Sequence, residues 1–370
     1  MSKVYFIAGG GTAGHVNPAL AIAEAIKERE ADSRIVFFVT KNGVENEMTK
    51  KAGFEQIIME ADRLPKGIGQ ALKFGHSSLS GYKTCIRAIE KYKPDAVIGT
   101  GGFVCGPLLL AASKRKVPYL IHEQNAFPGR ANRFFSKKAS AVCISFESSR
   151  EYFEQNNHVF YTGNPIKKIF FEMTSEKARE ALNIPSEKFL VLIMGGSLGA
   201  MPINKAIIEI FKDNLWQKMK IKYPELMLAI STGPRNYQDI KNDLSEYDLT
   251  DVHIEKYLDS TLWLPASDLY VGRAGASSAF ESAATGTATI FLPYPYAADN
   301  HQYYNAKAFS TNNAAILMED RDFNGKILLD QIRFLIENRS ILFDMQKKAK
   351  ANAMPNSASQ IVDVLFKYVL

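Results

Sequence analysis

The chain has 370 residues, more than a single average domain, so we expect two domains. Hydrophobic residues make up 46% of the sequence and charged residues 23%, a composition typical of globular proteins that bury sizeable cores. The formal net charge of +6 favours anionic partners, but the basic residues are too dispersed to indicate nucleic-acid binding.

Short apolar runs alternate with amphipathic stretches through the first part of the chain. Helices are expected over Ala19–Lys27 and Leu108–Lys114, between the apolar runs. This alternation predicts an α/β fold with a doubly wound parallel sheet. The expected strands are Val4–Ala8, Ile35–Thr40, Ala96–Thr100, Tyr119–His122 and Ala141–Ser145.

The segment "TGNPI" at 162–166 combines Gly with Asn-Pro, and the α/β alternation starts afresh after it. We therefore expect an N-terminal domain over 1–163 and a C-terminal domain over 164–340. The helical stretch 341–370, interrupted by "MPNS" at 354–357, is expected to rejoin the first domain. Strands of the second domain are expected at Leu190–Met194, Met227–Ser231, Val252–Glu255, Leu269–Val271 and Ala288–Leu292.

A glycine loop, "GGGTAGHVNP" at 9–18, follows the first strand and precedes a helix. Gly9, Gly11 and Gly14 satisfy the dinucleotide fingerprint G-x-G-x-x-G. That fingerprint also needs an acidic residue at the end of the second strand to bind a ribose, and Thr40 and Lys41 stand there instead. The sequence thus argues against NAD and predicts a different anion on the amide groups of the helix N-terminus.

The same pattern of strand, glycine loop and helix recurs at 191–207, "VLIMGGSLGAMPINKAI". In both copies a proline is expected in the first helical turn, where its missing N–H leaves no hydrogen bond unmade, and Asn17 is expected to cap the first helix. Two such loops predict two Rossmann-like domains that face a shared cleft and bring two phosphorylated substrates together.

Several motifs then occur in order: "GGGTAGHVNPALAIA", "VIGTGGFVCGPLLLAA", "IHEQNAFPGRANR", "TGNPI", "MGGSLGAMPIN" and "RAGASSAFESAATGTATIFLPYPYAADNHQYYNA". Together they resemble the MurG family of peptidoglycan glycosyltransferases over nearly the whole chain. The resemblance implies a GT-B fold and transfer of N-acetylglucosamine (GlcNAc) from UDP-GlcNAc to the muramoyl sugar of undecaprenyl-diphosphate-linked lipid I. It also implies inversion at the anomeric carbon, no metal or other cofactor, and cell-wall or divisome proteins as partners.

Glu281 is the candidate for binding the uridine ribose, because one carboxylate can accept hydrogen bonds from both ribose hydroxyls. The small residues that precede it, "RAGASSAF", allow close approach of a ligand. The chain departs from the family pattern at Ala13, Phe103 and Lys167, where the family usually carries Gly, Tyr and Arg. The resemblance assigns to UDP-GlcNAc binding, besides Glu281, the residues Thr12, Ala13, Gly14, Asn125, Lys167, Ser197, Leu258, Ala276, Ser277, Ser278 and Gln302.

His15, at the end of the first glycine loop, is the candidate general base that deprotonates the acceptor hydroxyl. The alternative is that His15 only binds the acceptor diphosphate or stabilises the loop. Glu123 of "HEQN" is the rival base, and His122 is expected to be structural. "HEQNA" does not match the zinc motif H-E-x-x-H, and "DRD" at 320–322 is expected to be a solvated loop and not a metal site.

Cys85, Cys105 and Cys143 lie far apart, which predicts reduced thiols in a cytoplasmic protein. Because a strand is expected almost at the N-terminus, we expect no signal peptide. No apolar run reaches the length of about 20 residues that would span a bilayer. Since a C55 lipid acceptor cannot leave the membrane, we expect docking on the anionic cytoplasmic face of the cell membrane through residues 64–93. The alternative is that the apolar positions of this segment face the domain core.

The expected membrane segment combines apolar and basic side chains. Basic tetrapeptide "SKRK" at 113–116 and "SKK" at 136–138 are expected to add positive charge on the same side. The apolar positions are Ile68, Leu72, Leu79, Tyr82 and Ile86, and the cations are Lys66, Lys73, Lys83 and Arg87.

Two other functions fit the same donor pocket. One is a UDP-GlcNAc 2-epimerase, which needs no second anionic substrate and therefore no first glycine loop. The other is a non-catalytic sensor of nucleotide sugars, which needs neither that loop nor His15.

Overall fold

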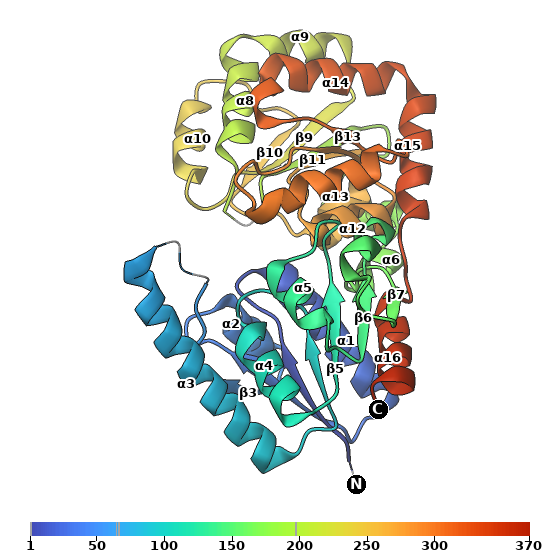
Figure 1. Ribbon diagram of the computed structural model, residues 1–370. Helices are drawn as coiled ribbons and strands as arrows, with labels where there is room; N and C mark the ends of the chain where they lie inside the picture. The colour runs from blue at the N-terminus through green and yellow to red at the C-terminus, as the bar shows by residue number, and fades with distance from the viewer. Residues whose placement is uncertain (1, 64, 66, 197) are drawn as a thin grey trace. The chain divides into compact units, whose positions relative to one another are not determined.

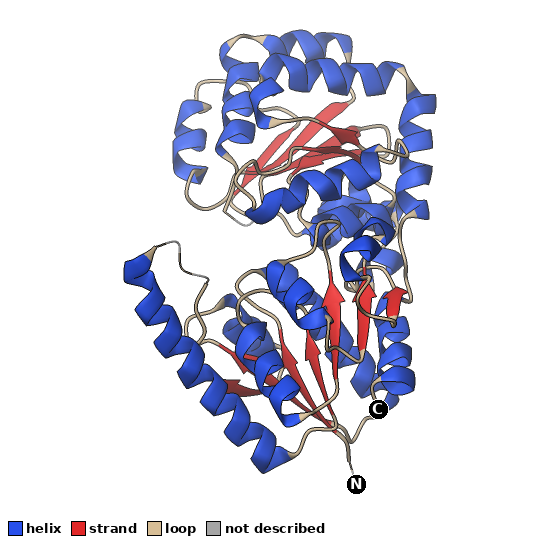
Figure 2. Cartoon of the chain, viewed as in Figure 1, coloured by secondary structure: helices blue, strands red, loops and turns tan. Residues whose placement is uncertain are grey.

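The structure, a computed structural model, describes residues 2–63, 65, 67–196 and 198–370, and it divides into two compact α/β units (Figure 1). Unit 1 comprises Met1–Lys167 and Met354–Leu370, and unit 2 comprises Lys168–Ala353. Helices flank the strands in each unit (Figure 2).

Within its described residues, unit 1 is built on a parallel sheet of seven strands in the order β3-β2-β1-β4-β5-β6-β7. Successive side chains of the central strands alternate between two buried clusters, as the two-residue period of a strand requires. Tyr5 and Ile7 of β1 pack toward α1 and α16, whereas Phe6 and Ala8 pack toward α3 and α4. The strands are β1 (Val4–Ala8), β2 (Arg34–Val39), β3 (Glu55–Ile58), β4 (Ala96–Gly99), β5 (Tyr119–Glu123), β6 (Ala141–Ile144) and β7 (Val159–Tyr161).

Helices connect the successive parallel strands of unit 1, as expected for a doubly wound fold, and α16 is added from the end of the chain. They are α1 (Ala13–Arg29), α2 (Val44–Lys51), α3 (Ile68–Tyr92), α4 (Cys105–Arg115), α5 (Arg130–Ser136), the 3₁₀ helix η1 (Glu147–Phe153) and, at the end of the chain, α16 (Ser357–Tyr368).

The described part of unit 2 holds a second parallel sheet, of six strands in the order β10-β9-β8-β11-β12-β13. Its core joins Val191 and Ile193 of β8 with apolar residues of the flanking helices, such as Ile207 and Ile332. The strands are β8 (Phe189–Met194), β9 (Leu226–Ser231), β10 (Val252–Glu255), β11 (Leu269–Gly272), β12 (Ala288–Phe291) and β13 (Ile316–Leu317).

The helices of unit 2 precede, connect and follow the strands of this second sheet. They are α6 (Ile169–Glu172), α7 (Ser175–Leu182), α8 (Met201–Lys212), α9 (Leu215–Lys222), α10 (Tyr237–Asp243), α11 (Ser260–Ala266), α12 (Ala276–Thr285), η2 (Ala298–Asn300), α13 (His301–Ser310), η3 (Asp320–Asp322), α14 (Gly325–Glu337) and α15 (Arg339–Ala351).

The C-terminal segment divides between the units. Leu342 and Met345 of α15 belong to the core of unit 2, whereas Ile361 and Leu365 of α16 belong to the core of unit 1. Of the stretch 341–370 expected to join the first domain, the part from Met354 onward does so. The expected helix break at 354–357 is confirmed.

The predicted strands are confirmed to within one residue at their ends, and the sequence missed β3, β7 and β13. All three missed strands lie at sheet edges, where partial exposure removes the continuous apolar run that marks a central strand.

The expected cap at Asn17 is wrong. Helix α1 begins five residues earlier than a cap at Asn17 implies, because the chain turns at Gly11 (φ +86°) and is already helical at Ala13, after Thr12. Pro18 therefore lies inside α1, where its ring nitrogen cannot donate to the preceding turn. In the second copy the expectation holds, since Pro202 lies in the first turn of α8.

Replacing Leu365 by Ala should destabilise unit 1 by about 2–5 kcal/mol, because it leaves a cavity under α16. Both tryptophans, Trp216 and Trp263, lie in unit 2. Urea unfolding followed by far-UV circular dichroism should shift, while the tryptophan fluorescence transition should not. Lys367→Ala, at an exposed position of the same helix, is the control, and equal shifts in both signals would contradict the prediction.

Candidate functional site

The first glycine loop packs against the loop that follows β4. The Gly10 amide donates to Gly101 O at 3.3 Å, and Thr100 Oγ1 donates to His15 O at 2.7 Å. Gly102 has a φ of +79°, and a Cβ placed there would lie 1.9 Å from Gly10 O. Only glycine fits such a contact, so the "TGG" motif holds the first glycine loop by close backbone packing.

A buried carboxylate that the sequence reasoning missed also holds this loop. Glu45 is 0% exposed, and its Oε2 accepts from the Gly11 amide at 3.1 Å. Its Oε1 accepts from the Thr40 amide and hydroxyl at 3.2 and 2.5 Å. The acidic residue that would bind a ribose in a dinucleotide site is thus absent at Thr40. Glu45, five residues later, cannot replace it, because its carboxylate is hydrogen-bonded within the protein.

A chain of buried polar side chains connects His15 to the "TGNP" loop. His15 Nδ1 lies 3.0 Å from Gln124 Oε1, and Gln124 Nε2 lies 2.9 Å from His122 Nδ1. The other nitrogen of His122, Nε2, lies 3.1 Å from Gly163 O. Burial lowers the pKa of His122 to about 4, so this ring is neutral at physiological pH. The expectation that His122 is structural fits these contacts.

Glu123, the rival base, is 1% exposed and anchors the loop before α5. Its Oε1 accepts from the amide and the side chain of Asn125 at 2.9 and 3.1 Å. Its Oε2 accepts from the Gly129 amide at 3.0 Å and from Asn132 Nδ2 at 2.8 Å. Four donors occupy the carboxylate, which leaves it poorly placed to take a proton from a substrate.

In unit 2 the second glycine loop lies between β8 and α8. A Cβ at Gly199 (φ +78°) would lie 2.1 Å from Thr232 O, so this loop too depends on glycine for close packing. Ser197, assigned to the donor diphosphate, lies outside the described residues.

The donor motif forms the N-terminal part of α12. Ala276 is the first helical residue, and no side chain caps the helix at Gly275. The hydroxyl of Ser277 is buried and has no hydrogen-bond partner among the described residues, which suits a ligand that supplies one. Ser278 and Glu281 are partly exposed on the same helix. An uncapped helix N-terminus with a spare hydroxyl is chemically suited to a phosphate.

Arg273 fixes the segments around this helix. It is 8% exposed, and its guanidinium donates to Leu292 O at 2.9 Å and to both carboxylate oxygens of Asp320. The expectation that "DRD" is a solvated loop is therefore wrong for Asp320. This residue belongs to the 3₁₀ helix η3 and forms an ion pair with Arg273. Beside this pair lies a pocket of about 540 Å³ lined by Pro293, Pro295, Tyr296, Asn300, Tyr303, Glu319, Asp320 and Arg321.

Gln302, assigned to the sugar, begins α13 together with His301, and its Oε1 accepts from the Tyr294 amide at 2.9 Å. Among the residues that the structure describes, its amide nitrogen has no hydrogen-bond partner. Leu258 follows β10 in a loop and is partly exposed.

The other predicted donor residues lie in unit 1. Thr12, Ala13 and Lys167 are exposed, and Gly14 and Asn125 are partly exposed. Within unit 1, the structure brings together the glycine loop, His15, His122 and Glu123. Within unit 2, it brings Ala276, Ser277, Ser278 and Glu281 onto one helix.

Two parallel-sheet units, each with a glycine loop on a helix N-terminus, define the GT-B class of fold. Residues 5–144 match the glycosyltransferase family 28 N-terminal domain, and residues 190–361 match the family 28 C-terminal domain. The chain therefore belongs to glycosyltransferase family 28.

Curated relatives and a solved structure agree with this assignment. A UDP-N-acetylglucosamine–N-acetylmuramyl-(pentapeptide) pyrophosphoryl-undecaprenol N-acetylglucosamine transferase of Acetivibrio thermocellus is 37% identical over 97% of this chain and 96% of its own. A transferase of the same name from Caldanaerobacter subterraneus is 36% identical over 98% of both chains. The crystal structure of Acinetobacter baumannii MurG matches with a TM-score of 0.76 and 28% identity, over 99% of this chain and 100% of that one.

A UDP-GlcNAc 2-epimerase of Neisseria meningitidis also matches, with a TM-score of 0.69 over 99% of this chain and 100% of that one. Its sequence identity is 15%, so this likeness concerns the fold alone. The epimerase alternative is not favoured, because the relatives that share over a third of their sequence with this chain are transferases.

Unit 1 should lose stability as the pH falls, because the neutral His122 ring must be protonated when the chain unfolds. Its folded pKa, about 4, is below the ordinary 6.5, so the unfolded chain binds more protons between these values and acid favours unfolding. The loss should reach ~2 kcal/mol between about pH 7 and about pH 5, measured by urea unfolding with circular dichroism.

His122→Gln should flatten this pH dependence, whereas His158→Gln, at an exposed position of the same unit, should preserve it. If unit 1 is equally stable at both pH values, His122 is not held neutral.

Proposed function

We propose that the protein transfers GlcNAc from UDP-GlcNAc to the muramoyl sugar of undecaprenyl-diphosphate-linked lipid I, giving lipid II for peptidoglycan synthesis. The observation that carries this proposal is the identity of 36–37% over nearly the whole chain with transferases of that name. Cell-wall or divisome proteins are the partners that such a reaction would have.

Unit 2 would bind the donor. The free amide groups and the Ser277 hydroxyl at the N-terminus of α12 would receive the diphosphate, with Ala276 and Ser278 beside them. Glu281, further along the same helix, would accept both ribose hydroxyls. The backbone of Leu258 would bind uracil, and Gln302 and Asn125 would bind the sugar. Lys167, exposed at the end of unit 1, and Ser197 would stabilise the diphosphate as UDP leaves.

Unit 1 would bind the acceptor, and His15 would act as general base. The acceptor hydroxyl attacks the anomeric carbon, its proton passes to His15, and UDP leaves with the electrons of the broken bond. General-base catalysis contributes about 10²–10⁴-fold to such a step. His15 is favoured over Glu123 because the Glu123 carboxylate is buried and already accepts four hydrogen bonds.

The reaction itself is tested by incubating the protein with UDP-GlcNAc and a soluble lipid I analogue in the presence of EDTA. UDP release that depends on the analogue is the expected result. Release of free N-acetylmannosamine would support an epimerase instead, and binding of UDP-GlcNAc without turnover would support a sensor.

Glu281→Ala should raise the KM for UDP-GlcNAc by one to two orders of magnitude, since hydrogen bonds to a charged group contribute about 1.5–3 kcal/mol. The kcat at saturating donor should change much less. Glu246→Ala, at an exposed position of unit 2, serves as the control. An unchanged KM for Glu281→Ala would remove this carboxylate from the donor site.

The lipid acceptor requires the protein to reach the membrane, and no helix within the described ranges is long and apolar enough to cross one. Helix α3 offers a docking surface instead. Leu72 is 84% exposed and Leu79 53% exposed, next to the exposed Lys73 and Lys83. Exposed apolar side chains ringed by cations favour reversible binding to anionic lipid.

The remaining apolar positions of the predicted membrane segment, 64–93, either pack against the core of unit 1 or have side chains outside the described residues. Tyr82 and Ile86 pack against the core of unit 1, as the alternative reading expected for all of them. Leu64 and Lys66 lie outside the described residues, as does the side chain of Ile68. The exposed Phe134 of α5, 68% accessible, adds an apolar side chain near Arg133 and Lys137.

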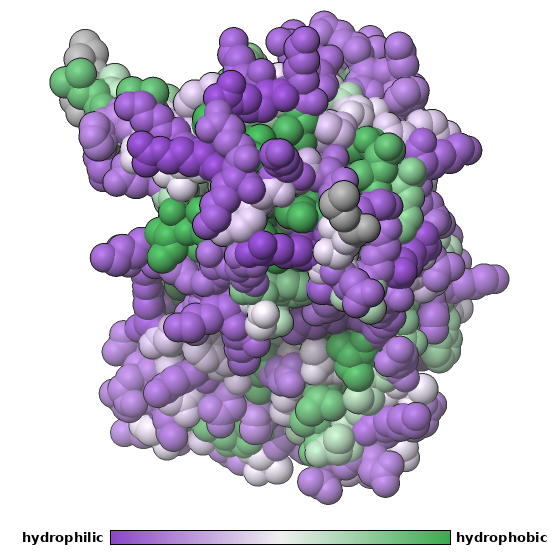
Figure 3. Space-filling view, turned by 90° about the horizontal axis from the view of Figure 1, so that it is seen from below, coloured by the Kyte–Doolittle hydropathy of each residue, from purple (hydrophilic) through white to green (hydrophobic). Residues whose placement is uncertain are grey.

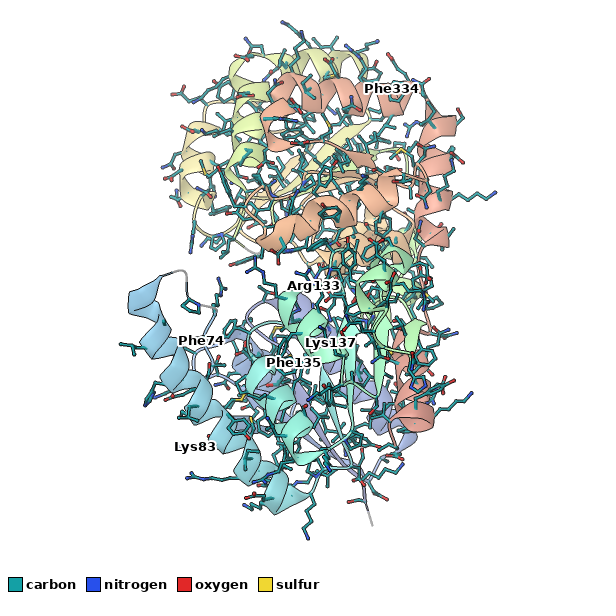
Figure 4. The ribbon with its side chains drawn as sticks, viewed as in Figure 1. Phe74, Lys83, Arg133, Phe135, Lys137 and Phe334 are labelled. Carbon is teal, nitrogen blue, oxygen red and sulfur yellow. The ribbon has the colours of Figure 1, made fainter. Side chains whose placement is uncertain are left out.

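Figure 4 labels Phe74 and Lys83 along α3, and Arg133, Phe135 and Lys137 around α5. Seen from below, apolar areas alternate with hydrophilic ones over the surface (Figure 3).

The double variant Leu72→Ser, Leu79→Ser should stay folded, because both side chains are largely exposed. It should no longer sediment with liposomes that contain phosphatidylglycerol, yet it should keep its activity on a short-chain soluble acceptor. Ile221→Ser, which alters an 85% exposed residue of unit 2, is the matched control. Sedimentation equal to that of the unaltered protein would show that α3 is not the membrane contact.

A further inference from the structure

We propose that Gln124 is a positioning residue, which holds the neutral His15 ring in the form that carries its proton on Nδ1 and leaves the lone pair on Nε2. The proposal deepens the proposed function, because it rests on His15 acting as the base and identifies the atom that takes the proton.

The hydrogen bonds of His15 are consistent with one position of its ring hydrogen. Nδ1 lies between two oxygen acceptors, Thr100 O at 3.2 Å and Gln124 Oε1 at 3.0 Å. A backbone carbonyl oxygen cannot donate, so Nδ1 must supply the hydrogen. A neutral imidazole carries a single N–H, and its Nε2 is therefore an acceptor.

The orientation of the Gln124 amide is fixed from the opposite end. Its nitrogen lies 3.2 Å from His122 O, a carbonyl that only accepts, so the NH₂ group faces His122 and the oxygen faces His15. Gln124 is 1% exposed, which excludes the solvent that would otherwise let the amide turn over. The amide therefore accepts from one histidine and donates to the other.

His122 lies at the other end of this series of hydrogen bonds, and its contacts require that Gln124 donates to it. Its Nε2 faces Gly163 O at 3.1 Å and Ser145 Oγ at 3.2 Å. The Ser145 hydroxyl donates its own hydrogen to Glu123 O at 2.8 Å, so it accepts from His122. Nε2 is thus the protonated atom, and Nδ1 is the acceptor that Gln124 requires. The low pKa of His122, about 4, keeps this ring neutral and the direction of the chain fixed.

The consequence is chemical. As the acceptor hydroxyl attacks, its proton moves to the Nε2 lone pair of His15, and the ring becomes an imidazolium with both nitrogens protonated. Nδ1–H keeps its two acceptors throughout, and they stabilise the positive charge that forms. In the opposite tautomer, Nε2 would carry a hydrogen and no base would face the acceptor. An orienting partner on the far nitrogen is the same device that fixes the histidine of a catalytic triad.

The test begins with the unaltered protein. Histidine labelled with ¹⁵N, observed in long-range ¹H–¹⁵N spectra at alkaline pH, should show His15 protonated at Nδ1 and unprotonated at Nε2. His15→Asn identifies the signals. Protonation at Nε2 in the unaltered protein would overturn the proposal without the need for any further variant.

The variant Gln124→Met keeps the size of the side chain and removes its amide. With one of the two acceptors of Nδ1 removed and Thr100 O retained, we expect part of the His15 population to move toward the Nε2–H form. The kcat should fall about tenfold or more, with the KM for UDP-GlcNAc within about twofold. Gln360→Met, at an exposed position of α16 in the same unit, should change neither. A Gln124→Met protein with unchanged tautomer and unchanged kcat would overturn the proposal.

Failure of the proposed function gives a different result. If His15→Asn keeps full kcat on the soluble acceptor, His15 is not the base, whatever its tautomer. If His15→Asn is inactive but the unaltered ring is protonated at Nε2, His15 is needed for activity and the role of Gln124 is refuted.

Discussion

The loops at the carboxyl ends of the first sheet depend on one requirement: buried polar groups must be paired. Four separate motifs converge there, the first glycine loop, "TGG", "HEQN" and "TGNP". Gln124 lies at the centre, joined to His15 on one side and His122 on the other, while the carbonyl groups of Thr100 and Gly163 terminate the chain. An unpaired buried amide or imidazole costs about 1–3 kcal/mol, so the loops are stable together and not separately.

The parts of the fold that the sequence could predict are those that are continuously buried. Central strands such as β1 and β8 are buried on both faces, and their continuous apolar runs identify them directly. The edge strands β3, β7 and β13 are partly exposed and short, so no run of that kind marks them. The expectation of a cap at Asn17 is wrong because Pro18 lies inside α1 and does not start it. The glycine turn before it had already aligned the backbone for a helix.

The candidate site was predicted as a set of residues, and its internal connections were not. Glycine loops and motif order identify His15, Glu123 and the α12 segment, because spacing along the chain is visible in a sequence. That Glu45 holds the Gly11 amide, or that Arg273 pairs with Asp320, depends on contacts between residues more than 30 positions apart. Such pairs leave no periodic signal. For Arg273 a chemical hint was available, because a guanidinium within a segment of apolar and small residues needs a partner. Glu45 lies in a polar segment that gives no such hint.

The two units fix their loops by different chemistry, and the difference matches the roles proposed for them. In unit 2 the positive Arg273 is neutralised by Asp320 and by the carbonyl oxygen of Leu292, so it serves as a rigid tie with its charge balanced. In unit 1 the tie to His15 is a neutral amide. A carboxylate in that place would stabilise the imidazolium form more strongly than an amide does. In the arrangement proposed for unit 1, the amide orients the ring and keeps the Nε2 lone pair available, which is what a general base needs before the acceptor hydroxyl reacts.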